Sequence, residues 1–463
     1  MKNGHKSVTI FGAGLSGLTF AYELNELGVS LRVIEKHSSA GGLCRSIRKD
    51  GFTFDLGGHR LYADKPWIIE KVKEILGEEM LCTKRKSRIL LNGKFFNYPL
   101  KPRSAFFSFG FGKSLKILTG YFKSKLKAKQ INKVNEMSFE DWVVSRFGRT
   151  LYEIYFEPYT EKVWGLPCKN ISADWAAQRI SPFNLIETIK GALLNSKKFA
   201  DRFTTSQFFY PVRGGIGRIA DRVVEKLKAS GNEVLFHSEP TEIRCEKDMV
   251  KSVLIANGKS SFELKSDHFI STIPLTKLIL MLKPTPPSEI MEAASKLTYR
   301  AVICVFLILN KPMVTDDTWI YFPEKSIFFG RAHEPRNWSR ENASDGKTSL
   351  CLEVFCSEGD YFWQMPDKEI ISKVVYDLKR LEFIKKGDVE DCFLSRVPYA
   401  YPVYKMGYQN HLSRVRQYLS QFKNLHLLGR TGKFRYMNMD HVIEESVEKA
   451  RELYRPAQRM AGF

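Results

Sequence analysis

The sequence predicts an α/β fold, in which the parts of a Rossmann-type domain are interleaved along the chain with a helical subdomain and an antiparallel-sheet substrate domain. An apolar, β-branched strand at residues 7–11 leads into a glycine-rich turn and then into helical spacing over residues 15–27. The region up to about residue 200 has mainly helical spacing after a hairpin at residues 88–98. Apolar strands at residues 301–309 and 349–355 then predict a second sheet.

The chain has 463 residues, which fits two or three interleaved domains. We expect residues 1–80, 206–298 and 406–463 to form the nucleotide-binding domain, the last part through an apolar strand near residues 424–428 and a C-terminal helix from about Asp440. Residues 81–205 are expected to form a mainly helical substrate or lid region, and residues 299–405 the sheet of the substrate domain.

The amino-acid composition limits the classes of function that the chain can have. Hydrophobic residues make up 43% and charged residues 27%, which supports a packed core and argues against general disorder. The formal net charge of +21 predicts an anionic partner: nucleic acid, anionic lipid or a phosphorylated small molecule. The scattered cysteines show no CxxC pair and no zinc-ligand spacing, so we expect reduced thiols and no metal site. Without a signal-peptide or membrane-span pattern, the expected location is the cytoplasm.

The first chemical motif is the GxGxxG turn after the first strand. Gly12 permits the tight turn, Gly14 lets the backbone approach a pyrophosphate, and Gly17 lets helix and strand pack closely. The phosphates would lie at the positive end of the helix. Glu35 ends the next strand, where an acid accepts hydrogen bonds from ribose hydroxyls. The combination predicts a dinucleotide site; the alternative is a purely structural turn.

Two further glycine-rich segments follow, GGLCR at residues 41–45 and FDLGGH at residues 54–59. With the first motif, they resemble the opening of the amine-oxidase-like flavoproteins, which include protoporphyrinogen oxidase and UDP-galactopyranose mutase. The resemblance implies that the cofactor is FAD. The cofactor contacts that it implies in this stretch are Gly42, Arg45, Gly57 and Gly58. Arg45 would contact a phosphate or the ribityl chain, although it could also be an ordinary surface arginine.

Three segments resemble the UDP-galactopyranose mutases in particular: PYTEKVWG at residues 158–165, GRTGKFRYMNMD at residues 429–440, and GGH at residues 57–59. The resemblance implies FAD contacts at Gly429, Arg430 and Asp440, nucleotide-sugar contacts at Tyr159, Trp164, Arg179 and Tyr436, and positioning or catalytic roles for His59, Arg179 and Tyr436. These residue types suit the ligand, because a diphosphate binds arginines and tyrosine hydroxyls and a base packs on an aromatic face.

Each of these residues also has a structural interpretation. Tyr159 and Trp164 could be core residues, and His59 could be a hydrogen-bonded structural histidine. Arg179 could be a surface ion-pair partner, because its assignment rests on spacing alone.

The sequence departs from the short bacterial mutases in three places. Met437-Asn438 replaces their polar and aromatic pair, an AYPVY segment occupies residues 400–404, and a basic segment occupies residues 101–133. This mosaic resembles the protoporphyrinogen-oxidase-like proteins of polysaccharide biosynthesis, so the exact sugar stays open.

The leading hypothesis is a flavoenzyme that acts on a nucleotide-linked sugar, such as a UDP-sugar, by mutase-type pyranose/furanose isomerisation with reduced flavin. The alternative is an FAD-dependent oxidoreductase that resembles amine oxidase or protoporphyrinogen oxidase and oxidises a small molecule or sugar. A third class, a non-catalytic or membrane-associated FAD protein, would show neither activity.

The basic segment at residues 101–133 mixes lysines with phenylalanine and tyrosine and contains no acid. It could bind an anionic membrane surface peripherally. We favour a lid-like helical subdomain whose aromatic side chains pack inward while its lysines stay solvated. No recognised nucleic-acid motif accompanies the charge, so no specific nucleic-acid binding is expected.

Overall fold

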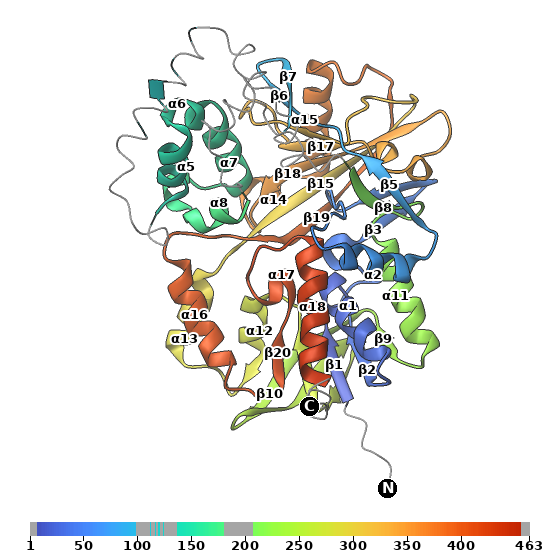
Figure 1. The fold of residues 1–463 in the computed structure, drawn as a ribbon, viewed down its shortest axis with the longest axis vertical. Coiled ribbons are helices and arrows are strands. Elements are labelled where there is room, and N and C mark those ends of the chain that lie inside the picture. Colours follow the sequence, from blue (N-terminus) through green and yellow to red (C-terminus); the bar gives the residue numbers. More distant parts are fainter. Residues whose placement is uncertain are drawn as a thin grey trace, which may run out of the picture.

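The computed structural model describes residues 7–98, 137–179 and 207–454, with the isolated positions 112, 116, 119, 120 and 124. The chain folds into two stacked lobes, one built on a parallel sheet and the other on a larger, mainly antiparallel sheet (Figure 1). The predicted α/β fold, with a Rossmann-type domain interleaved with a sheet-based substrate domain, is confirmed. Nearly all of the basic segment at residues 101–133 lies outside the described residues.

The lower lobe is centred on a parallel sheet assembled from distant parts of the chain. Its order is β20 (Leu425–Leu427), β13 (His268–Ser271), β1 (Ser7–Phe11), β2 (Ser30–Ile34) and β9 (Glu233–Leu235). Val8 and Ile10 point to one face and Phe11 to the other, because side chains alternate along a strand. Both faces are covered, which explains why these strands read as continuous apolar runs.

Helices cover the first face of this sheet (Figure 1). They are α1 (Leu15–Asn25), α2 (Pro66–Leu76), α11 (Arg218–Ala229) and α18 (Met439–Tyr454). In α11 the apolar stripe of Ile219, Val223 and Leu227 is buried, while arginine and glutamate residues face outward, as expected of an amphipathic helix.

The second face packs against a small sheet and three helices. The sheet has the order β12 (Ser260–Leu264), β11 (Met249–Asn257), β10 (Ser238–Glu246) and β14 (Leu282–Lys283). The helices are α12 (Leu275–Met281), α13 (Ser288–Lys296) and α16 (Tyr408–Leu419).

The upper lobe contains a seven-stranded sheet. Its order is β19 (Val389–Pro402), β15 (Tyr299–Leu309), β18 (Thr348–Cys356), β17 (Arg331–His333), β16 (Trp319–Tyr321), β6 (Ser87–Leu91) and β7 (Lys94–Asn97). All neighbours are antiparallel except β16 and β6. The predicted hairpin at residues 88–98 is therefore an edge of this sheet.

One face of the upper sheet packs on α15 (Asp367–Arg380), and the other on a helical cluster. The cluster consists of α5 (Phe139–Phe147), α6 (Arg149–Leu151), a π-helical turn (Tyr152–Phe156), α7 (Glu157–Trp164) and α8 (Ala173–Arg179). Two further antiparallel strand pairs complete the described strands: β3 (Ser46–Lys49) with β4 (Phe52–Asp55), and β5 (Met80–Lys84) with β8 (Gln207–Pro211). The short helices α14 (Tyr361–Gln364) and α17 (Gly429–Gly432) complete the described α-helices.

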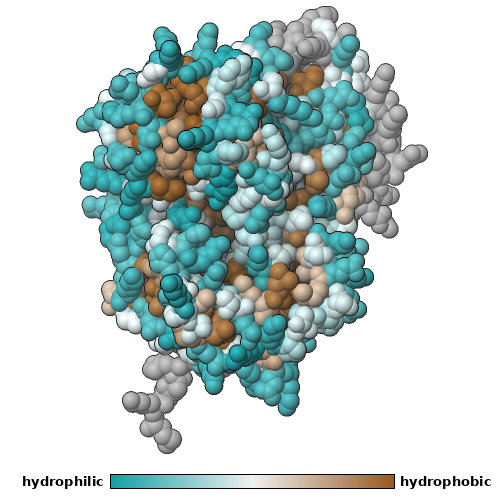
Figure 2. Space-filling model, turned by 180° about the vertical axis from the view of Figure 1, so that it is seen from behind, coloured by the Kyte–Doolittle hydropathy of each residue, from teal (hydrophilic) through white to brown (hydrophobic). Residues whose placement is uncertain are grey.

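Seen from behind, the surface is mainly hydrophilic, and its apolar side chains lie in separate patches (Figure 2). No helix within the described ranges is both long and apolar enough to cross a membrane.

Candidate functional site

The dinucleotide loop has the geometry that its glycines predict. A Cβ atom on Gly17 would lie 2.2 Å from the carbonyl oxygen of Gly12, so only glycine lets α1 approach the turn this closely. A backbone bridge between Gly14 and Gly41 brings the GGLCR segment beside the first loop. Gly429 packs on Ser16 of the same loop, where an added Cβ would lie 2.6 Å from Ser16 Oγ. Three segments far apart in sequence thus form one cradle.

Glu35 organises the cradle from the end of β2. Its Oε2 accepts a hydrogen bond from the Ala13 amide, and its Oε1 accepts one from the His37 amide, each at 2.9 Å. Each carboxylate oxygen keeps a lone pair for a further donor. The ribose contact of Glu35 stays a prediction, but the carboxylate is held where the nucleotide loop turns.

Two polar groups around the cradle have unused hydrogen-bonding capacity among the described residues. Asp440, in the first turn of α18, has a buried Oδ1 without a hydrogen bond, although His441 Nδ1 lies 3.7 Å away. Arg45 is half-buried, burial lowers the pKa of its guanidinium, and no hydrogen bond from the guanidinium is found among the described residues. A helix N-terminus, an arginine and backbone amides around a glycine turn fit the pyrophosphate and ribityl chain of FAD.

The loop at residues 57–59 touches the upper sheet directly. A Cβ on Gly58 would fall 1.3 Å from a carbon of the Trp319 ring, so the backbone lies flat on that ring. The Gly58 amide donates to Glu353 Oε1 at 3.3 Å. His59 follows; its Nδ1 is buried without a described partner. Burial, with a smaller contribution from Arg430, lowers the pKa of His59 to about 4, so the imidazole is neutral at pH 7.

An ion pair that the sequence analysis did not identify lies beneath this loop. Arg331 of β17 and Glu353 of β18 are directly paired in register, and Arg331 Nε lies 3.3 Å from Glu353 Oε2. Arg331 Nη2 donates to the Tyr401 hydroxyl at 3.0 Å. The sequence contained a signal for this pair. Glu353 is the single charged residue in the buried TSLCLEVFC strand, where an unpaired charge would destabilise the fold.

Tyr401 joins the predicted substrate residues. Its ring is nearly parallel to that of Tyr436, with centroids 6.0 Å apart, and lies 6.1 Å from that of Trp164. The guanidinium of Arg430 lies 4.8 Å from the Tyr436 ring centroid and 5.7 Å from that of Tyr401. The AYPVY segment, which the sequence analysis treated only as a departure, therefore supplies the residue that connects Trp164, Tyr436 and Arg430.

Tyr159 reaches the same region through Tyr321, at a centroid distance of 5.7 Å. Burial raises the pKa of the Tyr159 and Tyr401 hydroxyls, and Arg331 opposes this rise in both, so the two phenols stay protonated hydrogen-bond donors at neutral pH. Arg179 ends α8, and its side chain lies outside the described residues; its role stays a prediction.

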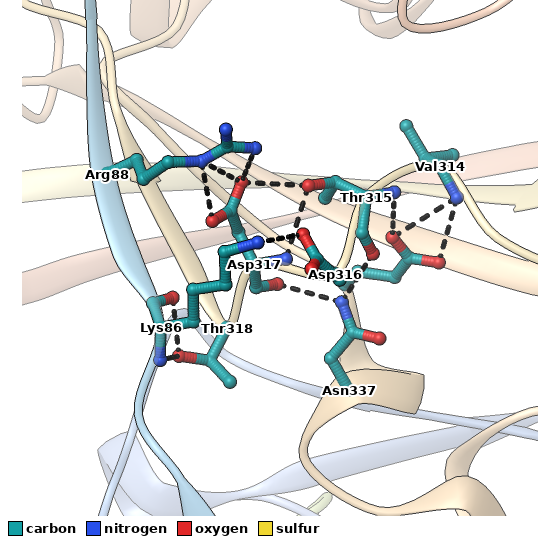
Figure 3. Close-up of polar contacts among 9 residues, drawn as sticks. Lys86, Arg88, Val314, Thr315, Asp316, Asp317, Thr318 and Asn337 are labelled. Carbon is teal, nitrogen blue, oxygen red and sulfur yellow. Dashed lines mark hydrogen bonds and ion pairs between the residues drawn. The ribbon is translucent and has the colours of Figure 1, made fainter. Parts of the chain in front are cut away.

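A buried polar network fixes the strand that carries Trp319 (Figure 3). Asp317 accepts hydrogen bonds from Arg88 Nε at 2.8 Å and Nη2 at 2.6 Å, and Thr315 Oγ1 donates to the same carboxylate at 2.8 Å. Asn337 donates to the carbonyl oxygens of Thr315 and Asp317. The network ties β6 to β16 and so fixes the ring against which Gly58 packs.

The site as a whole is positively charged. Arg331 and Arg430 approach Tyr401, and Arg60 lies 5.3 Å from the Trp319 ring centroid. Glu353 is the carboxylate paired with Arg331. Such an arrangement favours an anionic ligand with several oxygen acceptors. All eight cysteines are free thiols, and the residues that the structure describes include no group of three or more His, Cys, Asp or Glu side chains placed to hold a metal ion.

Comparisons with known proteins show which proteins the chain is similar to. An L-amino-acid oxidase of Sistrurus catenatus edwardsii is 23% identical over 498 residues, covering 99% of this chain and 89% of its own. Coproporphyrinogen III oxidase of Staphylococcus aureus is 21% identical over 443 residues, covering 90% of this chain and 92% of its own.

Two solved structures share the fold. Reduced UDP-galactopyranose mutase superposes with a TM-score of 0.82 at 24% identity, covering 97% of this chain and 93% of its own. A protoporphyrinogen oxidase homologue from Exiguobacterium sp. 255-15 superposes with a TM-score of 0.71 at 18% identity, covering 97% of this chain and 98% of its own. The sequence profile of the flavin-containing amine oxidoreductases matches residues 15–453. The chain therefore belongs to the flavin-containing amine oxidoreductase family, and its cofactor is FAD.

Proposed function

We propose that this flavoenzyme isomerises the sugar of a nucleotide sugar between its pyranose and furanose forms, as UDP-galactopyranose mutase does. The observation that carries the proposal is a cluster of arginine side chains and protonated tyrosine hydroxyls at the upper sheet, in which Arg331 donates to Tyr401 and Arg430 lies over the ring of Tyr436. These groups match the oxygens of a diphosphate, which accepts charge-assisted and bidentate hydrogen bonds.

The same charges argue against a cationic amine as substrate. A protonated amine near Arg331 and Arg430 would be repelled by about 4 kcal/mol per unit charge at 4 Å and an effective dielectric constant of 20. Glu353 offsets the charge of Arg331, because the two form an ion pair, so the repulsion comes from Arg430.

The residues of the site would have different roles in this reaction. Arg331 and the hydroxyls of Tyr401 and Tyr436 would hold the diphosphate while it leaves the sugar and returns, so that it stays oriented for recombination. Trp164, whose buried indole Nε1 has no described partner, would line the base or sugar end together with Tyr159. When bound and reduced, FAD would supply the nucleophile for the anomeric carbon. Neutral His59 would orient the reacting sugar without adding charge.

A second candidate is oxidation of a carboxylated substrate. The relatives include L-amino-acid oxidases and a coproporphyrinogen III oxidase. A carboxylate would also bind Arg331, because an arginine fork donates to carboxylate and phosphate oxygens alike. The positively charged site therefore also suits a carboxylated substrate.

The test uses the FAD-loaded protein. UDP at one hundred times its Kd should raise the stability by about 2.7 kcal/mol, and uridine should do so weakly because it lacks the diphosphate. With UDP-galactopyranose, the dithionite-reduced enzyme should form a chromatographically distinct isomer with no net consumption of reductant, and the oxidised enzyme should form none. Steady oxygen uptake with L-amino acids or coproporphyrinogen III, without any response to UDP, would replace this proposal with the oxidase.

A further inference from the structure

The geometry points to Lys162 as a positioning residue that fastens helix α7, which carries Tyr159 and Trp164, to the turn that precedes Arg331. Lys162 has no role in any of the predictions above. The consequence for ligand binding rests on the proposed function, whereas the fastening itself does not.

The three N–H donors of the Lys162 ammonium all bind carbonyl oxygens of one turn. The ammonium donates to the carbonyl oxygens of Phe322 at 2.9 Å, Glu324 at 2.9 Å and Phe329 at 2.7 Å. An ammonium has three N–H donors, so none is left over for a ligand. Lys162 therefore does not contact substrate; it acts on the backbone that lies between two strands of the upper sheet.

That turn lies between the strands that carry Tyr321 and Arg331. It connects Tyr321, the last residue of β16, to Arg331, the first residue of β17. The Phe322 amide donates to the Gly330 carbonyl at 2.9 Å, which closes the turn. The Gly330 amide donates to the Glu353 carbonyl at 2.9 Å, which continues the ladder to β18. The three carbonyls held by Lys162 thus belong to a backbone segment continuous with the Arg331–Glu353 pair.

The C-terminal end of α7 is fastened separately. Arg300 of β15, which is buried, donates from Nε to the Val163 carbonyl at 2.8 Å and from Nη1 to Ser357 Oγ at 2.7 Å. Helix α7 therefore has one fixed point on β15 and another, through Lys162, on the turn between β16 and β17. These two points set the distances from Tyr159 to Tyr321 and from Trp164 to Tyr401.

The fastening has no described bond to the FAD cradle, whose loops lie in the lower lobe. Removal of the ammonium would leave three carbonyls of one turn without their donor, and the turn and α7 would separate. The expected effect is therefore confined to substrate binding and turnover. A displacement of about 1 Å in a positioning group can reduce the reaction rate about 100-fold.

The first experiment compares Lys162→Met with a matched control, Lys325→Met, in the FAD-loaded enzyme. Lys325 lies on the same turn and pairs with Glu161 of the same helix at 2.9 Å, but it is exposed. Lys162→Met should keep its FAD content and its reduction by dithionite, while kcat/KM for UDP-galactopyranose falls about 100-fold and the Kd for UDP rises. Lys325→Met should bind UDP within about twofold of wild type, because exposed ion pairs contribute little. A Lys162→Met protein that binds UDP as tightly as wild type overturns the inference.

Amide hydrogen exchange tests the fastening without any ligand. In Lys162→Met, residues 157–164 and 322–330 should exchange faster together, whereas the cradle at residues 12–17 should not change. Unchanged exchange in both segments contradicts the inference. If wild type shows no response to UDP, the proposed function fails, and exchange still decides the role of Lys162. If Lys162→Met does not fold, Lys162→Gln, which retains two donors, is measured in the same way and should show a smaller change of the same kind.

Discussion

The Arg331–Glu353 pair allows a quantitative test of the site. Glu353 is 2% exposed, and its carboxylate receives Arg331 at 3.3 Å and the Gly58 amide at 3.3 Å. Arg331→Met removes the countercharge and leaves a buried carboxylate with one long hydrogen bond. Breaking a buried pair from one side typically costs about 3–5 kcal/mol, so the free energy of unfolding should fall by about that amount.

The double variant Arg331→Met/Glu353→Gln should lose less than the single Arg331→Met, because the remaining amide carries no charge. Urea unfolding of the FAD-loaded wild type, both single variants and the double variant gives the coupling energy of the pair. If Arg331→Met costs less than about 1 kcal/mol, or if the double variant is less stable than Arg331→Met, the carboxylate is not held by Arg331 and the description of the pocket is wrong.

Three further outcomes follow from the geometry. Gly58→Ala places a Cβ against the Trp319 ring and should lower the free energy of unfolding by about 3 kcal/mol. The variant should also lose its flavin and be colourless. A yellow protein of normal stability contradicts the close contact. Burial lowers the pKa of His333 to about 3, whereas the unfolded chain takes up that proton near pH 6.5, so stability should fall as the pH drops from 6.5 to 5. His333→Phe should remove about 2 kcal/mol of that fall, and an unchanged pH slope in urea melts would refute the assignment. Arg45→Met should raise the Kd for FAD about tenfold because a charge-assisted contact is lost, whereas Arg48→Met, which removes an exposed arginine paired with Asp221, should leave flavin titrations unchanged.

The cofactor end of the molecule was predictable because its signals are local. The strand at residues 7–11, the glycine turn and the start of α1 follow one another within a short stretch, and backbone sterics alone require glycine there. The late strand near residue 425 and the helix starting near Asp440 were also found from apolar spacing. The sequence analysis did not anticipate the short helix Gly429–Gly432 between them, whose four residues show no helical periodicity.

Residues proposed to bind the substrate were predicted only where a motif marked them. Tyr159, Trp164 and Tyr436 stay predicted substrate contacts, and the structure brings Trp164 and Tyr436 to Tyr401. Arg331, Glu353 and Tyr401 were missed, since each lies on a different strand and their proximity depends on strand register. A single charge in an apolar run indicates that a partner exists, but not which one.

The sequence by itself determined the nucleotide-binding turn, the acid that follows it and the presence of two sheets along the chain. These features depend on neighbouring residues and on hydrophobic periodicity. Only the tertiary structure decided which residues gather around Tyr401 and how α7 is attached to the upper sheet. The first depends on strand register, and the second on residues more than one hundred positions apart, since Lys162 contacts Phe322 and Arg300 contacts Val163. Strand register in a sheet and the contact between a turn and a distant helix depend on how the whole chain packs. A pattern of neighbouring residues does not specify which distant segments meet.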